Sequence, residues 1–594
     1  MKKNLLLLKK LAFAIKEVYL SAPITFCCSV IISIVSGLGA YVAIDISRRI
    51  LNCLQNIYLQ NEKFERIIPL IILSAAVTLA ISFLGWLGSV VTAKQKYKFS
   101  LYINQTFLKK NSELDIASFD TPEYFNILGE VEKSKNTLNF IVYRVIHFFS
   151  FIVSLAISFS VIFTYQDKYL GFIIILFILP ALFNKGKYYT KLYKYDAATL
   201  PLQRKVSYCA RILLNRETAK EIRFYNLKQY LLGKYNDNVN EQINGKKKII
   251  YKYGIIDSIC NVLPMVGVMM VMFIVARNII NGNGTIGDFS FYLGIFVTFK
   301  SNLLGMVEDI SKLRESEYAI DKYKEFMALS PVIKDDGGLD IDSIEKIEFK
   351  NVSFIYPNSK EFVLNDVSFS MVCPEKIAIV GLNGSGKTTL IKLLLRFYDV
   401  TDGEILINGL NIKQYNLGKL RKLIAPAFQN NNIYSMSLRF NVALSDIEQS
   451  GDDEKITKKL KMFGLDRIAD GEELDRDVTC DFSENGIMLS GGEKQKLTLA
   501  RFSFADADLF IMDEPTAALD PISERKILND FRIAYADKGV IIISHRLSNI
   551  VDMDKIIVLN NGKIVEDGTH QELYANRGLY YEMYMRQSSK YSEC

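Results

Sequence analysis

The chain has 594 residues, a formal net charge of +7, and 49% hydrophobic against 23% charged residues. This length predicts more than one domain. The modest charge, with lysines in loops rather than on one face, argues against a nucleic-acid partner. The eight cysteines form no CxxC pair and only three histidines are present. We therefore expect neither a zinc site nor a disulfide framework, and the soluble part suits a reducing cytosol.

The N-terminal stretch, 1–19, combines basic residues with an apolar run. Lys9 and Lys10 interrupt this run, and no small-residue cleavage site follows closely. Both features argue against a signal peptide. We expect an N-terminal amphipathic segment that lies on the inner membrane face.

Long apolar stretches fill the next region, 20–310. Residues 20–44 and 67–93 contain no charge, and about 20 apolar residues cross the hydrocarbon of a bilayer. Two such stretches close together argue against buried soluble helices, and four weaker segments follow. The prediction is an α-helical transmembrane domain with six spans, at about 20–44, 67–93, 145–166, 169–184, 258–276 and 289–307.

Basic residues in the loops predict the orientation of these spans. With the N-terminus inside, the long inner loops, 94–144 and 185–256, are far richer in lysine and arginine than the outer loops. The positive-inside rule then places both chain ends in the cytoplasm of a multi-pass cell-membrane protein. Apolar residues at spacings of three and four predict that the inner loops are helices, which continue past the bilayer and carry a short cross-helix at each tip.

A linker, 311–344, precedes a region of different character, 345–594. Here apolar strands such as DLFIMD and GVIIIS alternate with helical stretches, which predicts an α/β domain with a mostly parallel sheet. GLNGSGKTT, Gly381 to Thr389, fits G-x-x-x-x-G-K-[ST] between a strand and a helix. This pattern predicts a phosphate loop. Lys387 would contact the β- and γ-phosphates, and the Thr388 hydroxyl would bind Mg²⁺.

Polar residues follow the later strands. LFIMDEP ends in two carboxylates, of which Asp513 is placed to hold Mg²⁺ and Glu514 to orient or deprotonate the attacking water. A merely solvated acid pair is the alternative. His545 can reach the γ-phosphate if its strand lies beside the phosphate loop. Gln429, in PAFQNN, looks like an ordinary loop residue. A second glycine-rich segment, LSGGE at 489–493, opens a helix and presents backbone amides to an anion.

These motifs, in this order over about 345–585, closely resemble the nucleotide-binding domain of ATP-binding cassette (ABC) transporters. The resemblance makes LSGGE the signature, which binds the nucleotide held by an opposing domain, and Gln429 a residue that senses Mg²⁺. It implies that Tyr356 stacks on adenine and that His545 is the switch histidine. The nucleotide-binding residues that it implies are Tyr356, Gly381, Asn383, Gly384, Ser385, Gly386, Lys387, Thr388, Thr389, Ser490, Gly491, Gly492 and Asp520. The implied Mg²⁺ ligands are Thr388, Gln429 and Asp513, and the implied catalytic residues are Glu514, His545 and Gln429.

The membrane half resembles that of type IV exporters, with FDTPEYFN (119–126) as the first coupling segment and NRETAKEIRFYNL (215–227) leading to the second. One cassette and six spans imply a half-transporter that must pair. Glu514 and His545 are both present, which favours a homodimer over a heterodimer. Two positions depart from the family pattern: Glu493 replaces the usual glutamine of the signature, and Ala517 replaces a common serine.

The resemblance implies ATP-driven export by alternating access. Peptides, lipids and hydrophobic drugs are the candidate cargoes, and the second inner loop favours a peptide. A leader-bearing peptide would need a separate peptidase, because no peptidase domain precedes the first span. Lys300, about 16 Å into the sixth span, could attract an anionic substrate. The alternatives are that it pairs with a carbonyl or that the boundary of this span lies elsewhere. A nucleotide-gated channel or a regulatory ABC membrane protein is the alternative function.

Overall fold

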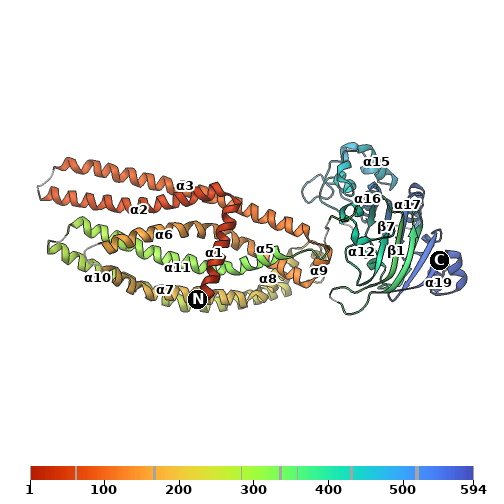
Figure 1. Ribbon diagram of the computed structural model, residues 1–594, viewed down its shortest axis with the longest axis horizontal. Helices are drawn as coiled ribbons and strands as arrows, with labels where there is room; N and C mark the ends of the chain where they lie inside the picture. The colour runs from red at the N-terminus through yellow and green to blue at the C-terminus, as the bar shows by residue number, and fades with distance from the viewer. Residues whose placement is uncertain are drawn as a thin grey trace. The chain divides into compact units, whose positions relative to one another are not determined.

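The computed structural model describes residues 2–59, 63–164, 169–282, 284–333, 337–357, 359–428, 432–514 and 521–592. The chain divides into two compact units (Figure 1). The first comprises Met1–Glu113 and Phe125–Leu329, and the second comprises Leu114–Tyr124 and Ser330–Cys594. The first unit is helical, and the second contains all the strands that the described residues form. Each unit is described separately below.

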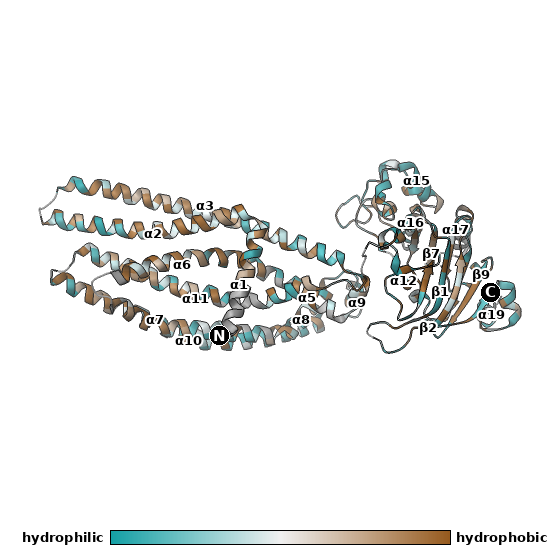
Figure 2. Ribbon diagram, viewed as in Figure 1, coloured by the Kyte–Doolittle hydropathy of each residue, from teal (hydrophilic) through white to brown (hydrophobic). Residues whose placement is uncertain are grey.

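Six long helices build the first unit, and each contains a stretch that is apolar and long enough to cross a membrane. This confirms the predicted number of spans. Helix α3 has 47 residues, which makes it about 70 Å long, more than twice the hydrocarbon thickness. The span therefore continues far beyond the bilayer, and Figure 2 shows hydrophilic residues on its C-terminal part. The six helices are α2 (Pro23–Tyr58), α3 (Ile67–Glu113), α6 (Ile141–Thr164), α7 (Tyr169–Ala198), α10 (Lys228–Ile280) and α11 (Ile286–Ala328).

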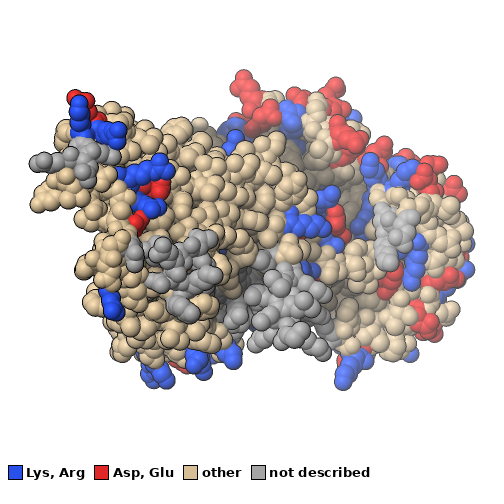
Figure 3. Space-filling model, turned by 60° about the vertical axis from the view of Figure 1, so that its left-hand side comes forward, with Lys and Arg blue, Asp and Glu red and all other residues tan. Residues whose placement is uncertain are grey.

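Large apolar side chains cover much of the outside of this bundle. Leu79 and Trp86 on α3 are 72% and 60% exposed, and Phe273 on α10 is 73% exposed. Figure 3 shows a broad surface of the helical unit on which few charged side chains lie. An exposed apolar surface of this extent is unfavourable in water, and it is the surface that lipid tails would cover.

Shorter helices complete the first unit. Helix α1 carries the predicted amphipathic segment, and its second half buries Ala14 and Val18. The Gln95 side chain of α3 donates to the Val18 carbonyl at 2.7 Å and to the Ser21 hydroxyl at 3.1 Å, which fixes the end of α1 on α3. The shorter helices are α1 (Lys2–Ser21), α5 (Pro122–Asn139), α8 (Leu200–Leu214) and α9 (Ala219–Phe224).

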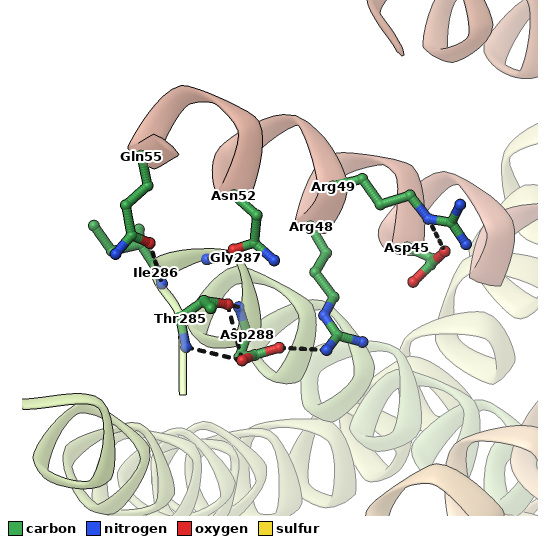
Figure 4. Close-up of polar contacts among 9 residues, drawn as sticks. All are labelled: Asp45, Arg48, Arg49, Asn52, Gln55, Thr285, Ile286, Gly287 and Asp288. Carbon is green, nitrogen blue, oxygen red and sulfur yellow. Dashed lines mark hydrogen bonds and ion pairs between the residues drawn. The ribbon is translucent and has the colours of Figure 1, made fainter. Parts of the chain in front are cut away.

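An ion pair joins the far end of α2 to the start of α11 (Figure 4). Arg48 Nη2 lies 2.7 Å from Asp288 Oδ1, and the Arg48 guanidinium lies 5.1 Å from the Phe291 ring centroid. Asp288 also forms a capping box with Thr285, the N-cap residue of α11. The same carboxylate therefore caps the N-terminus of α11 and links this helix to α2.

Two further side chains of α2 satisfy backbone groups of α11. The first N–H groups of a helix have no partner within it. Asn52 Oδ1 accepts from the Gly287 N–H at 2.9 Å, and Gln55 Oε1 accepts from the Ile286 N–H at 3.2 Å. Gly287 permits this approach, because a Cβ there would lie 2.3 Å from the Arg48 carbonyl oxygen. We call the contacts of Arg48, Asn52 and Gln55 with α11 the α2–α11 junction.

The second unit is an α/β domain with two sheets. The smaller sheet has the order β2-β1-β4-β5 with antiparallel pairing, and the larger has the order β10-β9-β3-β8-β7-β6, in which all pairs except β10–β9 are parallel. This confirms the predicted α/β domain with a mostly parallel sheet. The strands are β1 (Lys346–Phe354), β2 (Leu364–Val372), β3 (Lys376–Gly381), β4 (Asp402–Ile407), β5 (Leu410–Asn411), β6 (Ile424–Ala427), β7 (Leu509–Asp513), β8 (Gly539–Ile543), β9 (Lys555–Asn560) and β10 (Lys563–Gly568).

Helices surround the larger sheet, and the central strands β7 and β8 are buried along their whole length. The strand labelled β7 is coloured brown in Figure 2, as expected for a strand covered on both faces. The helices are α12 (Lys387–Leu394), α13 (Leu417–Lys422), α14 (Leu438–Ala443), α15 (Asp453–Met462), α16 (Gly491–Phe504), α17 (Pro521–Ala534), α18 (His570–Asn576) and α19 (Leu579–Ser592).

A segment from the membrane half of the sequence belongs to this second unit. It contains the short helix α4 (Ile116–Phe119), at the start of the predicted first coupling segment. Asp115 Oδ2 accepts from the Ile333 N–H at 2.8 Å, the Tyr398 hydroxyl donates to Asp120, and Ala117 lies in the domain's apolar core. The segment is thus held to the α/β domain by polar and apolar contacts together.

Candidate nucleotide-binding site

The phosphate loop connects β3 to α12 at the centre of the larger sheet. Gly381 has a φ of 154°, and a Cβ there would lie 2.1 Å from the Leu559 carbonyl oxygen. Gly386, the N-cap residue of α12, has a left-handed φ of 104° and provides no side-chain cap. The conformation therefore depends on glycine, and it leaves the first N–H groups of α12 available to an anion.

Lys387 bends back over this loop. Its side chain is buried, and Nζ donates to the carbonyl oxygens of Gly381 at 2.9 Å and Leu382 at 3.0 Å. Burial lowers the pKa of Lys387, whereas the nearby carboxylates of Glu514 and Asp513 raise it. A buried ammonium held by carbonyl groups alone would gain from an anionic partner.

A polar cavity of about 470 Å³ lies over the loop. The Ser385 hydroxyl is buried and has no hydrogen-bond partner among the residues that the structure describes. An unsatisfied buried hydroxyl is costly, and a ligand oxygen could satisfy this one. The cavity is lined by Val363, Asn383, Gly384, Ser385, Gly386, Lys387, Thr388, Thr389, Glu514 and His545.

Two carboxylates lie at the end of β7. The Asp513 side chain is 4% exposed and accepts a hydrogen bond from the Thr388 side chain. Burial raises the pKa of Asp513. Glu514 follows with a φ of 50°, and its N–H donates to the Ile543 carbonyl at 3.1 Å. Oxygen groups of Thr388 and Asp513 thus lie together, which is the donor chemistry that Mg²⁺ prefers.

His545 Nε2 pairs with Glu514 Oε1 at the edge of the cavity. His545 lies just after β8, which is paired with β3 on one side and β7 on the other. The carboxyl ends of parallel strands meet at one edge of a sheet. This strand order brings the phosphate loop, the two acids and the histidine together.

Tyr356 lies just after β1 and is half-buried. Its hydroxyl is 3.1 Å from Thr389 Oγ1, and Lys392 Nζ lies 5.3 Å from its ring centroid. The ring also contacts Phe354 and Tyr398 edge-on. Tyr356 is therefore tied to α12, next to the phosphate loop.

The signature does not line this cavity. Ser490 is exposed and forms the N-cap of α16 in a capping box with Glu493. The cavity thus brings residues 383–389 together with Glu514 and His545, and a hydrogen bond from Thr388 adds Asp513. Ser490, Gly491 and Gly492 do not line it. Gln429 and Asp520 lie outside the described residues.

Sequence reasoning missed Arg467. Arg467 Nη2 lies 2.8 Å from Glu493 Oε1, and this pair, with the hydrogen bonds to Ser490, lowers the pKa of Glu493 to about 2. Arg467 precedes Glu493 by 26 positions, so no local pattern links the two residues. The one sequence feature that pointed to an unusual contact here was Glu493 itself, which departs from the family pattern.

The fold and the site together define an ATP-binding cassette protein with fused membrane spans. The sequence profile of the ABC transporter family matches residues 364–517. The subtilin transport ATP-binding protein SpaT of Bacillus subtilis is 30% identical over 591 residues, covering 98% of this chain and 95% of that protein. The chain belongs to the ABC transporter family and resembles its exporters.

Other relatives agree with this assignment. The nisin transport ATP-binding protein NisT of Lactococcus lactis is 28% identical and covers 88% of this chain and 87% of its own length. The mitochondrial iron-sulfur clusters transporter ATM1 of Candida glabrata is 33% identical over 62% of this chain and 51% of its own. A bacterial Atm1-family ABC exporter with ATP bound has the same fold, with a TM-score of 0.80 and 20% identity over 95% of this chain and 98% of that one.

Proposed function

We propose that this chain is a half-transporter that pairs with a second copy and uses ATP hydrolysis to export a peptide from the cytoplasm. The observation that carries the proposal is the polar cavity over the phosphate loop, with Lys387, Asp513 and Glu514 at one sheet edge. The same chain contains six candidate membrane spans, and ATP hydrolysis would drive transport through the domain that they form.

ATP binds with its phosphates against the loop. The backbone amides at the start of α12 and the Lys387 ammonium contact the β- and γ-phosphates, and Ser385 donates its free hydroxyl. Thr388 and Asp513 would hold Mg²⁺, which would neutralise part of the phosphate charge. Tyr356, which lies beside α12 through its contact with Thr389, contacts the adenine.

Glu514 orients the attacking water and accepts its proton. The water oxygen forms a bond to the γ-phosphorus, the bond to the β–γ bridging oxygen breaks, and ADP and phosphate leave. His545 fixes the Glu514 carboxylate through the contact already described and reaches the γ-phosphate from the end of β8. Gln429 and Asp520 keep the roles that the family resemblance implies, as Mg²⁺ ligand and nucleotide contact.

Pairing completes the site. Ser490, Gly491 and Gly492 lie at a helix N-terminus outside the cavity of their own chain, where they can contact the γ-phosphate bound to a partner. Apolar residues at the tip of the inner helices support the same arrangement. Phe224 on α9 is 83% exposed and the neighbouring Tyr225 is 65% exposed, a surface that a partner cassette would cover. We favour a homodimer.

The cargo is a peptide, and export runs out of the cytoplasm. Two relatives that align over most of the chain are named for the transport of subtilin and of nisin. The excess of basic residues in the inner loops supports a cytoplasmic location for the cassette. Lys300 on α11 is half-buried and forms no hydrogen bond or ion pair with the described residues, which suits attraction of an anionic group on the cargo.

The test is ATP-dependent uptake of candidate peptides, lipids and dyes into inside-out vesicles. Glu514→Gln should retain ATP binding but reduce both hydrolysis and uptake by about 100-fold or more, as for loss of a general base. Glu448→Gln, at an exposed site on the same domain, serves as the control. Wild-type hydrolysis by the Glu514 variant would contradict the assigned base. Flux without steady ATP turnover would instead indicate a nucleotide-gated channel.

A further inference from the structure

The signature contains a carboxylate, Glu493, whose negative charge would repel the phosphate that the signature is proposed to bind. Glu493 lies in the first turn of α16, where one carboxylate oxygen accepts from the Ser490 N–H at 2.9 Å. A carboxylate stabilises a helix N-terminus because it offsets the positive end of the helix dipole. The same positive end must attract the phosphate of a bound nucleotide. The residue that caps the signature therefore also competes with its ligand.

Arg467 contacts the other oxygen of this carboxylate. It belongs to the short 3₁₀ helix η4 (Asp466–Ile468), and its Nη2 lies 2.8 Å from Glu493 Oε1. The guanidinium is 63% exposed, and ion pairs at such exposure contribute little to folding stability. Its effect on the local electrostatic potential is more direct, because the two opposite charges lie beside the same helix N-terminus.

We propose that Arg467 is a positioning residue for the signature: it holds the Glu493 carboxylate in the capping box and offsets its charge, so that Ser490–Gly492 can accept a phosphate. This inference rests on the proposed function, in which the signature binds the nucleotide of the partner subunit. It explains why this chain tolerates a glutamate at the position where glutamine is usual: the positive charge of Arg467, on η4, offsets the negative charge of Glu493.

A double-mutant cycle in the full-length protein, reconstituted in lipid nanodiscs, tests the proposal. The measured quantities are the KM for MgATP and the kcat of hydrolysis. Arg467→Ala should raise KM about three- to fivefold, the size expected for one charge beside a helix N-terminus. Glu493→Gln keeps an oxygen for the Ser490 N–H and removes the charge, so it should lower KM. The double variant should return KM to near the wild-type value.

Two further measurements separate this role from a structural one. The KM difference between Arg467→Ala and the wild type should shrink from 0.05 M to 1 M salt, because the Debye length falls to about 3 Å at 1 M. Arg532→Ala is the matched control, since Arg532 on α17 also pairs with a carboxylate, Asp552, at 3.1 Å. It should leave KM unchanged.

Three outcomes would overturn the inference. An unchanged KM in Arg467→Ala would show that Arg467 does not offset the charge of Glu493. A raised KM that Glu493→Gln does not correct would show that Arg467 acts on the nucleotide itself. A raised KM that is independent of salt would indicate a change of shape rather than of charge. If the wild-type protein hydrolyses no ATP at all, the proposed function fails instead, and the two failures are distinguishable.

Discussion

The two glycine-rich helix starts of the cassette differ in how their first N–H groups are satisfied. Helix α12 begins after Gly386, which offers no side-chain cap, whereas α16 begins after Ser490, which forms a capping box with Glu493. A helix start without a cap is costly unless a ligand provides the missing acceptors. The start of α12 therefore leaves its first N–H groups to an anion, whereas the start of α16 is capped by side chains of the protein itself.

This difference predicts unequal consequences for the two sites when one side chain is removed. Loss of a phosphate-loop residue should impair binding of the chain's own nucleotide. Loss of a signature residue should first affect the helix and the step that joins two cassettes. The predictions below run from the largest expected effect to the smallest.

Lys387→Ala should have the largest effect. It removes the buried ammonium that faces the cavity, and a charge-assisted hydrogen bond contributes about 1.5–3 kcal/mol. ATP affinity should fall by at least about 10- to 100-fold per lost bond on that scale, as measured by fluorescence titration with a labelled nucleotide. Lys422→Ala, at an exposed site on α13, is the control. Retained affinity would mean that Lys387 does not contact phosphate.

Ser490→Ala should have an intermediate effect of a different kind. It removes the side-chain cap of α16, which costs about 1 kcal/mol of stability, and it would remove the proposed contact to the partner's nucleotide. Binding of ATP to the phosphate loop should persist, while turnover and ATP-driven pairing fall. Ser437→Ala provides the comparison, because Ser437 caps α14 in the same way, accepting from the Phe440 N–H at 3.2 Å. If both variants lost turnover equally, the effect would be on stability alone.

Asn52→Ala extends the comparison to a third helix start and should have the smallest effect. The start of α11 is capped by Thr285 and Asp288 and is also held by α2. Loss of the Asn52 acceptor leaves one N–H unsatisfied, at about 1 kcal/mol, and should lower the unfolding temperature by about 1–3 °C without altering ATP affinity. Arg49→Ala, which breaks a pair with Asp45 inside α2 alone, should shift it less. An equal shift would show that the inter-helix bond adds nothing.

The sequence predicted the elements whose signal is local. Long apolar runs, two of them free of charge over their whole length, predicted the six spans. The alternation of apolar strands with helices predicted the parallel sheet. The phosphate loop was recognisable because a fixed spacing of glycines precedes Lys387. The grouping of Asp513, Glu514 and His545 followed from strand ends, although the strand order that brings them together is set by long-range pairing.

Contacts between distant segments could not be predicted in this way. Arg467 and Glu493 are linked only through packing of the region around the start of α16. Likewise, no local pattern indicates that Tyr398 donates to Asp120 or that Asn52 accepts from Gly287. Such pairs depend on the tertiary fold, and a single sequence carries no record of which charges and amides meet across it.

The α2–α11 junction has a consequence for how the membrane unit can change shape. The first and last spans are held at one end by three separate bonds, and Gly287 allows no slack between the helices. Small sliding movements would strain all three bonds at once, so the two helices either travel as one body or separate in a single step. A change of shape at this end of the bundle would therefore break these contacts together rather than one after another.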